Sequence, residues 1–160
     1  LTHIPWLDPL VALIVGGMLG WTGLRLVRRS VGGLLDEEDK EILEGLVELF
    51  QNEQTPGIIQ LHHCRVIRSG RYHHIDAHVV IPEFWDVSEA HHETESFEAR
   101  LMKRYSYEGE IHFHVDPCRR AYCRVCDVAE CPIRKEKFVG RHQIQVQELT
   151  NPEEPAVFRE

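Results

Sequence analysis

The sequence predicts an α+β domain that follows one membrane-spanning helix and precedes a cysteine-rich C-terminal extension. Three observations predict this arrangement: an uncharged apolar run near the start of the chain, the order helix-strand-strand-helix-strand in its middle, and four cysteines within fourteen residues after it. The length of 160 residues suits one domain with an appendage. Because the chain begins at Leu1 and not at Met, we expect a fragment or a processed product.

The uncharged run covers residues 9–24 and, with its neighbours, approaches the roughly 20 residues that cross a bilayer. Trp6 and Trp21 are placed to lie near the two membrane interfaces. Three arginines follow the run: Arg25, Arg28 and Arg29. They mark a cytoplasmic end and, because they come after the apolar run, argue against a signal peptide. A buried helix of a soluble protein is the alternative, and sixteen uncharged residues with a basic stop favour the membrane.

The middle of the chain alternates between helical and strand periodicity. After a hinge with two glycines, Asp36 or Asp39 can cap the next helix. The predicted elements are a helix over residues 37–50, strands over 59–67 and 71–81 joined by a turn at Ser69-Gly70, a helix over 86–107 and a strand over 110–115. Both helices are expected on one face of the sheet. Residues 143–149 are a candidate further strand, and the polar tail after them is expected to be mobile.

The composition excludes one class of partner and indicates another. A formal net charge of −8 argues against nucleic acid, which requires a basic face. Eleven histidines and five cysteines are the unusual counts. An odd number of clustered cysteines fits metal ligation in a reducing compartment better than a disulfide framework.

Histidines and acids alternate with apolar residues along two of the predicted strands. Successive side chains of a strand point to opposite faces, so the polar residues of each strand share one face. They are His74, Asp76 and His78 in one strand and His112, His114 and Asp116 in the other. Imidazole and carboxylate are ligands of Zn²⁺, so two such strands side by side predict a metal-binding surface. The alternative is a polar face exposed to solvent, although histidine is seldom so frequent on such a face.

A second cluster follows the last predicted strand. Cys118, Cys123, Cys126 and Cys131 have the spacing C-x4-C-x2-C-x4-C. Four thiolates at such spacing can enclose a structural Zn²⁺ or hold an iron–sulfur cluster, and nearby arginines would offset their charge. A redox or disulfide role and unligated thiols are the alternatives. Cys64 stands alone in the first strand and is expected in the core.

These residues together resemble the cation diffusion facilitator (cation efflux) family of metal/proton antiporters, over residues 6–118. The segment WLDPLVALIVGGMLGWTGLRLVRRSVGGLLDE resembles the sixth and last transmembrane helix of that family and its exit. The residues after it resemble the cytoplasmic domain of the family, a ferredoxin-like αββαβ unit. The resemblance implies residues 1–30 as membrane helix, 31–36 as hinge and 37–117 as the metal-binding domain. It does not cover the extension, divided here into a metal-binding part over 118–150 and a mobile tail over 151–160.

The resemblance also implies a set of metal ligands at a dimer interface. Matched motif by motif, they are His62, His78, His91, His114 and Asp116. Asp36 resembles an acidic residue of the family that couples the membrane part to the domain. The implied partners are a second copy of the chain, the lipid bilayer and the missing transmembrane helices.

The function that the resemblance implies is not enzymatic. We expect the regulatory and dimerising C-terminal portion of a divalent cation efflux transporter in the cell membrane, with Zn²⁺ or another divalent transition metal as ligand. The full-length protein would exchange metal for protons, and its transport-site residues lie outside this chain. The alternatives are a membrane-tethered thiol or iron–sulfur redox protein and a stand-alone metal-buffering module.

Overall fold

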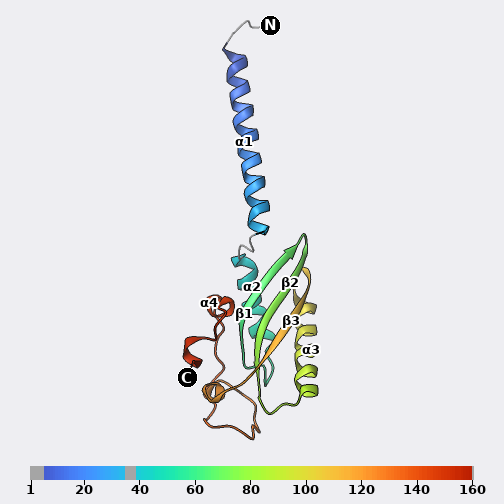
Figure 1. The fold of residues 1–160 in the computed structure, drawn as a ribbon, viewed down its shortest axis with the longest axis vertical. Helices are drawn as coiled ribbons and strands as arrows, with labels where there is room; N and C mark the ends of the chain where they lie inside the picture. The colour runs from blue at the N-terminus through green and yellow to red at the C-terminus, as the bar shows by residue number, and fades with distance from the viewer. Residues whose placement is uncertain (1–5, 35–38, 160) are drawn as a thin grey trace. The chain divides into compact units, whose positions relative to one another are not determined.

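The uncharged run forms a single helix, α1 (Leu7–Leu34), in the computed structural model, which describes residues 6–34 and 39–159 (Figure 1). Its segment Leu7–Arg28 is long and apolar enough to cross a membrane, and none of that segment is buried. A core helix of a soluble domain would bury one side, so this exposure does not favour the soluble alternative. The chain divides into two compact units, Leu1–Glu37 and Glu38–Glu160.

Helix α1 continues beyond the point at which the glycines of the predicted hinge were expected to end it. Residues 31–34 were expected to form part of a hinge, and they are helical. A glycine inside a helix costs only about 1 kcal/mol relative to alanine, which does not by itself stop the helix. Asp36, the residue predicted to couple domain and membrane part, lies outside the described residues.

Two amphipathic helices cover the sheet, as the periodicity predicted. In α2 (Lys40–Glu53) the buried residues recur at helical spacing, and the Asp39 carboxylate accepts hydrogen bonds from the backbone N–H groups of Glu41 and Ile42. In α3 (Val87–Arg104) the Asp86 carboxylate caps the first turn in the same way. Both helix starts therefore follow from an aspartate placed immediately before an amphipathic run.

The three strands form one mixed sheet in the order β1-β2-β3. Strand β1 (Gln60–Ser69) pairs antiparallel with β2 (Tyr72–Ile81) across a turn in which Gly70 has a φ of 70°. Strand β3 (Glu108–Pro117) follows α3 and pairs parallel with β2. The predicted ferredoxin-like α+β fold is therefore confirmed.

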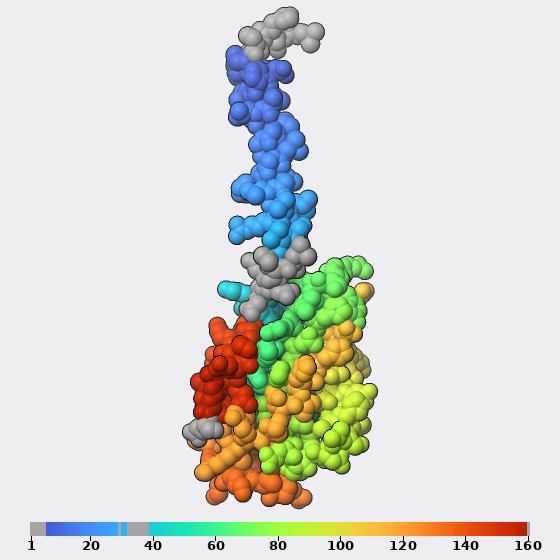
Figure 2. All heavy atoms as spheres, viewed as in Figure 1, coloured from blue at the N-terminus to red at the C-terminus, as the bar shows by residue number. Residues whose placement is uncertain are grey.

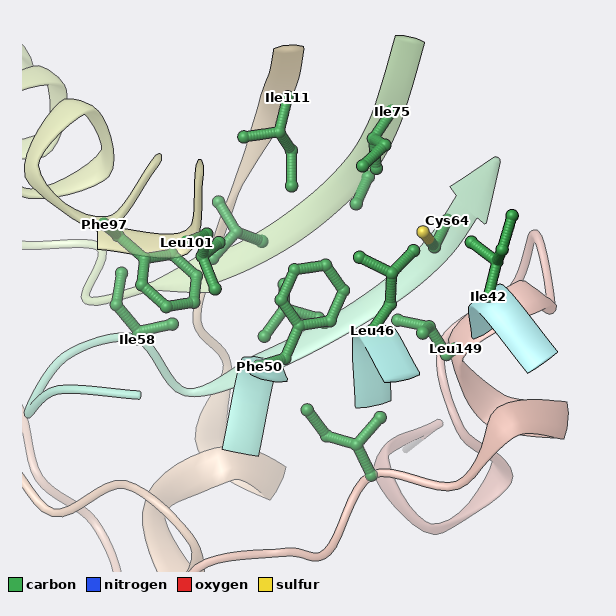
Figure 3. Packing of buried hydrophobic residues seen from close by; sticks show 14 of the residues in the cluster. Ile42, Leu46, Phe50, Ile58, Cys64, Ile75, Phe97, Leu101, Ile111 and Leu149 are labelled. Atoms are coloured by element: carbon green, nitrogen blue, oxygen red, sulfur yellow. The ribbon is translucent and has the colours of Figure 1, made fainter. Parts of the chain in front are cut away.

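The main core lies between the sheet and the two helices. Its large side chains come from α2, α3 and the inward faces of all three strands (Figure 3). Leu149 from the C-terminal extension belongs to the same cluster, where Figure 3 shows it near Leu46 and Cys64. Cys64 is 2% exposed, which confirms its expected core position.

The C-terminal extension packs on the domain in a way that the sequence did not predict. Its described elements are η1 (Arg120–Arg124), α4 (Val146–Thr150) and η2 (Ala156–Phe158). The predicted strand over residues 143–149 is wrong: the chain enters α4 there, so that Ile144 and Leu149 both reach the main core. The Gln51 amide on α2 donates a hydrogen bond of 2.8 Å to the carbonyl of Ile144.

The tail packs against the domain over residues 151–159, as far as it is described, and the mobility expected for residues 151–160 stays a prediction. Phe158 is 2% exposed and its ring stacks on Tyr122 with the centroids 4.5 Å apart. Both rings belong to a second apolar cluster, which also contains Ile59 and Val80. Because Val80 alternates with Val79 of the main core, this cluster lies on the opposite face of the sheet. Figure 2 shows the red residues of the extension beside the green residues of β1, in keeping with the contact of α4 with β1.

Candidate metal centre

Three side chains on the sheet face opposite the helices converge on one point. His62 on β1, His78 on β2 and Asp116 on β3 each offer a ligand atom, and these atoms all lie within 4.8 Å of one another. Oδ2 of Asp116 is 2.9 Å from Nδ1 of His78 and 3.6 Å from Nε2 of His62. Among the described residues this is the one group of three or more histidine, cysteine or acidic side chains that meets this spacing.

Strand register explains why these three residues meet. His62 lies directly opposite His78 in the antiparallel pair β1-β2. In the parallel pair β2-β3, Asp116 lies beside Val80, two residues beyond His78 and therefore on the same face. The site thus needs all three strands in this register, and a slip of one residue would turn one ligand toward the core.

A β-bulge adds an imidazole that the sequence analysis missed. The register shifts between His62 and Arg65, and His63 has a φ of 51°. Bulged residues leave the simple alternation, so His62 and His63 both lie over His78, with ring centroids 5.1 and 4.9 Å from it. The signal in the sequence was the pair of adjacent histidines, which strict alternation would place on opposite faces of the sheet.

The remaining predicted ligands differ in how close they come. His114 pairs with His78 across β2-β3 and stacks on its ring at 5.1 Å, although its nitrogens fall outside the group with mutual distances below 4.8 Å. His91 is exposed on α3, and within the described part of the chain no hydrogen bond or ring contact joins it to the group. A second copy of the domain would have to supply this imidazole.

The four cysteines of the extension do not reach the same spacing. Cys118 and Cys126 are buried, Cys123 and Cys131 are half-buried, and none of the four forms a disulfide. The group with mutual distances below 4.8 Å contains no cysteine among the described residues. Their role as ligands stays a prediction.

The electrostatics of the site suit a cation. Burial lowers the pKa of His62 from 6.5 to about 4, against the opposing effect of Asp116, so its imidazole is neutral near pH 7. Metal binding requires neutral imidazoles. Nδ1 of His62 and Nε2 of His63 are buried and make no hydrogen bond. Buried polar atoms without a partner are uncommon in native structures, and a cation bound at the unpartnered nitrogen of either ring would supply one. The residues therefore fit a divalent metal ion.

Replacing His62 by glutamine is expected to flatten the acid dependence of the domain's stability. Because the pKa of His62 is about 4 in the folded chain and 6.5 when unperturbed, the unfolded chain binds this proton first as the pH falls. The free energy of unfolding of the metal-free protein therefore decreases between pH 6.5 and 4, by up to about 1.4 kcal/mol per pH unit from this residue. Urea unfolding across this window measures the slope. His112→Gln, at a side chain that is 64% exposed, is the control and should keep the wild-type slope; an equally steep slope in His62→Gln contradicts the assignment.

Comparison with known proteins identifies the family. Residues 38–118 match the family model described as the cytoplasmic domain of cation efflux proteins. An uncharacterized transporter of Synechocystis (sll1263) is 29% identical over 113 residues, which are 70% of this chain and 36% of the relative. Metal tolerance protein 2 of rice is 29% identical over 113 residues, 70% of this chain and 28% of the relative. The cation-efflux pump FieF of Yersinia pestis is 29% identical over 115 residues, 69% of this chain and 36% of the pump.

Solved structures with a similar fold include the putative zinc transporter CzrB in its zinc form, with a TM-score of 0.47, 21% identity, and coverage of 51% of this chain and 91% of that one. The metal-bound C-terminal domain of the CzcD transporter from Thermotoga maritima has a TM-score of 0.45 and 22% identity, with coverage of 50% and 94%. The chain spans about a third of the length of the curated relatives that it matches. Since the matched segment is just over half of the chain, this protein belongs to the cation efflux, or cation diffusion facilitator, family of metal transporters and carries its C-terminal domain.

Proposed function

We propose that residues 38–160 are the cytoplasmic metal-binding regulatory domain of a divalent cation efflux transporter in the cell membrane. The observation that carries this proposal is the convergence of His62, His78 and Asp116 within 4.8 Å. The relatives named as efflux pump and metal tolerance proteins support the transport role of the complete protein. Export of metal in exchange for protons belongs to that complete protein, with its other membrane helices.

Zn²⁺ is the ligand that this donor set favours. Two imidazoles and one carboxylate match its usual nitrogen and oxygen ligands at about 2.0–2.2 Å. Three protein ligands leave one coordination position open. His63 and His114, whose rings lie 4.9 and 5.1 Å from His78, are the nearest side chains that could fill it within one copy.

A second copy of the chain is the other source of ligands, and this gives the site a regulatory role. His91 is exposed on α3 and available to a partner copy. A cation held by residues of two copies favours the closed dimer to the extent that it binds that state more tightly. In the complete transporter this shift in population would act on the membrane helices through the connection at Asp36.

The helix α1 serves as the last membrane helix in this proposal. Its 22-residue segment Leu7–Arg28 is long and apolar enough to cross a membrane. The arginines at the end of this segment indicate the cytoplasmic side. In this proposal the domain that follows α1 lies in the cytoplasm, where its imidazoles and thiols would bind metal before export.

Zinc-dependent self-association tests the proposal. Sedimentation velocity of the 160-residue chain in detergent is expected to show more dimer with Zn²⁺ than with chelator. His78→Ala should abolish this difference, because it removes the central ligand. The matched control is His74→Ala, at another imidazole on the same face of β2. A dimer fraction that does not change with zinc contradicts a metal-regulated dimer. So does a dimer fraction that increases with zinc as much in His78→Ala as in the unaltered chain.

A further inference from the structure

The loop after β3 follows an irregular path without a core large enough to explain it. From residue 127 to residue 143 the chain has no helix or strand and no buried residue. Loops of more than about 12–15 residues without secondary structure are uncommon in compact domains unless a function or another constraint fixes them. The family match ends at residue 118, so the family does not account for this loop either.

The loop is nevertheless closed on itself by polar contacts. The backbone N–H of Val139 donates a hydrogen bond of 2.8 Å to the carbonyl of Arg124, which joins the two ends of the loop. Inside it the Arg134 guanidinium donates to the carbonyls of Cys123, at 3.0 Å, and Cys126, at 3.1 Å. The Arg134 side chain, which lies inside the loop, thus holds the backbone at two of the cysteines.

Three of the four thiols lie in one electrostatic environment. Cys118 and Cys126 are both buried and belong to the same apolar cluster. The thiol of Cys131 is close enough to interact electrostatically with each of them. Cys118 directly follows β3, Cys126 follows η1, and Cys131 lies in the loop, so the three thiols come from separate segments of the chain.

Backbone N–H groups point at three of the sulfur atoms. The N–H of Lys135 donates to Sγ of Cys123 at 3.4 Å. The backbone of Glu83 donates to the Cys118 thiol and the backbone of Val128 to the Cys126 thiol. Hydrogen bonds to sulfur stabilise the thiolate form and are a regular feature of the second shell of metal–thiolate sites.

We propose that Cys118, Cys123, Cys126 and Cys131 bind one Zn²⁺ as a structural tetrathiolate site, separate from the site on the sheet. Zn–S bonds of about 2.3 Å place the sulfurs about 3.8 Å apart, whereas among the described residues no three of these sulfurs lie within 4.8 Å of one another without the ion. The proposal therefore requires the half-buried Cys123 and Cys131 side chains to turn toward the two buried thiols. On binding, four thiols release their protons, and the arginines of the loop offset the remaining negative charge.

The proposed zinc site accounts for the way in which η1 and the tail pack against the sheet. Cys118 and Cys126 belong to the second apolar cluster, together with Tyr122 and Phe158. A zinc ion bound to these cysteines fixes η1, and η1 in turn positions Tyr122 for its contact with the tail. Asp116 lies two residues before Cys118. A zinc ion bound to Cys118 therefore also fixes the end of β3, which carries a ligand of the site on the sheet.

Metal analysis in a background that lacks the first site tests the proposal independently of the proposed function. The full chain with His78→Ala and Asp116→Ala is purified in detergent and its zinc is measured by mass spectrometry. We expect about one zinc per chain, as one tetrahedral site requires. Adding Cys126→Ser should lower this content at least tenfold. Adding Cys64→Ala instead, which removes the one cysteine that is not a proposed ligand, should leave it unchanged.

A spectroscopic measurement covers the case in which Cys126→Ser does not fold. Cobalt added to the otherwise unaltered His78→Ala, Asp116→Ala chain should give the intense charge-transfer absorption of cobalt–thiolate bonds, which imidazole and carboxylate sites lack. The proposal is overturned if cobalt gives no such band, or if all four thiols react with a thiol reagent at the same rate with and without zinc. Purified protein that contains iron and acid-labile sulfide overturns it in favour of an iron–sulfur cluster. In every case zinc binding at the sheet site is measured separately in the chain that retains His78 and Asp116.

Discussion

Replacing His78 and Asp116 together by alanine is expected to lower the zinc affinity of the sheet site by more than about 100-fold. Changes to residues that only support a ligand already cost about 10–100-fold in metal affinity, and this variant removes two of the three converging ligands. It also leaves His62 buried with neither the carboxylate nor the imidazole that it faces. Isothermal titration of the full chain with Zn²⁺ measures the loss as the disappearance of one binding event.

The chain offers a closely matched control for this experiment. His74 and Glu110 are also an imidazole and a carboxylate from β2 and β3, with Nδ1 and Oε1 2.7 Å apart. They lie on the same sheet face as His78. Nε2 of His112 also lies 3.8 Å from this Glu110 oxygen, but among the described residues these three side chains do not all lie within 4.8 Å of one another, as the ligands of the candidate site do. His74→Ala with Glu110→Ala should therefore retain wild-type zinc binding. Equal losses in the two double variants would mean that any histidine and acid on this face attract zinc equally.

Replacing Leu149 by alanine is expected to lower the free energy of unfolding of the domain by about 2–5 kcal/mol, the cost of truncating a buried leucine. Leu149 is 0% exposed and packs in the main core between α2 and β1 (Figure 3). The effect would show that the C-terminal extension is part of the folded domain. Urea unfolding followed by near-ultraviolet circular dichroism measures it.

Val139→Ala is the control for this second prediction, because Val139 lies in the same extension and is 73% exposed. Its effect should stay within about 0.5 kcal/mol, as for other exposed positions. If Leu149→Ala also lowers the free energy of unfolding by less than about 0.5 kcal/mol, the extension does not stabilise the core. The statement that it is part of the folded domain is then wrong.

The elements with strong periodicity could be predicted from the sequence. Aspartates before amphipathic runs indicate the starts of α2 and α3, and the alternation along β2 and β3 is sufficient to place His78 and Asp116 on one face. The extension could not be predicted in the same way. Its two buried positions in residues 143–149, Ile144 and Leu149, are too few to define a period, and burial of Phe158 depends on a partner 36 residues earlier in the chain, Tyr122.

The candidate site was only partly accessible to sequence reasoning. His62, His78 and Asp116 were expected together and the structure brings them together, although their binding of metal stays a prediction. His63 was missed because a β-bulge is set by tertiary packing: Leu61 and Cys64 both enter the core, and the chain between them must take up one extra residue. His91 lies apart from this group within one copy of the chain, and its role as a ligand stays a prediction.

Anomalous diffraction at the zinc absorption edge, from crystals of the full chain grown with Zn²⁺, tests most directly whether the sheet face binds metal. We expect an anomalous peak within about 2.0–2.2 Å of nitrogen atoms of His62 and His78 and of an oxygen atom of Asp116. Zinc bound elsewhere on the protein, with His78 and Asp116 still hydrogen-bonded to each other and no peak between them, would contradict it.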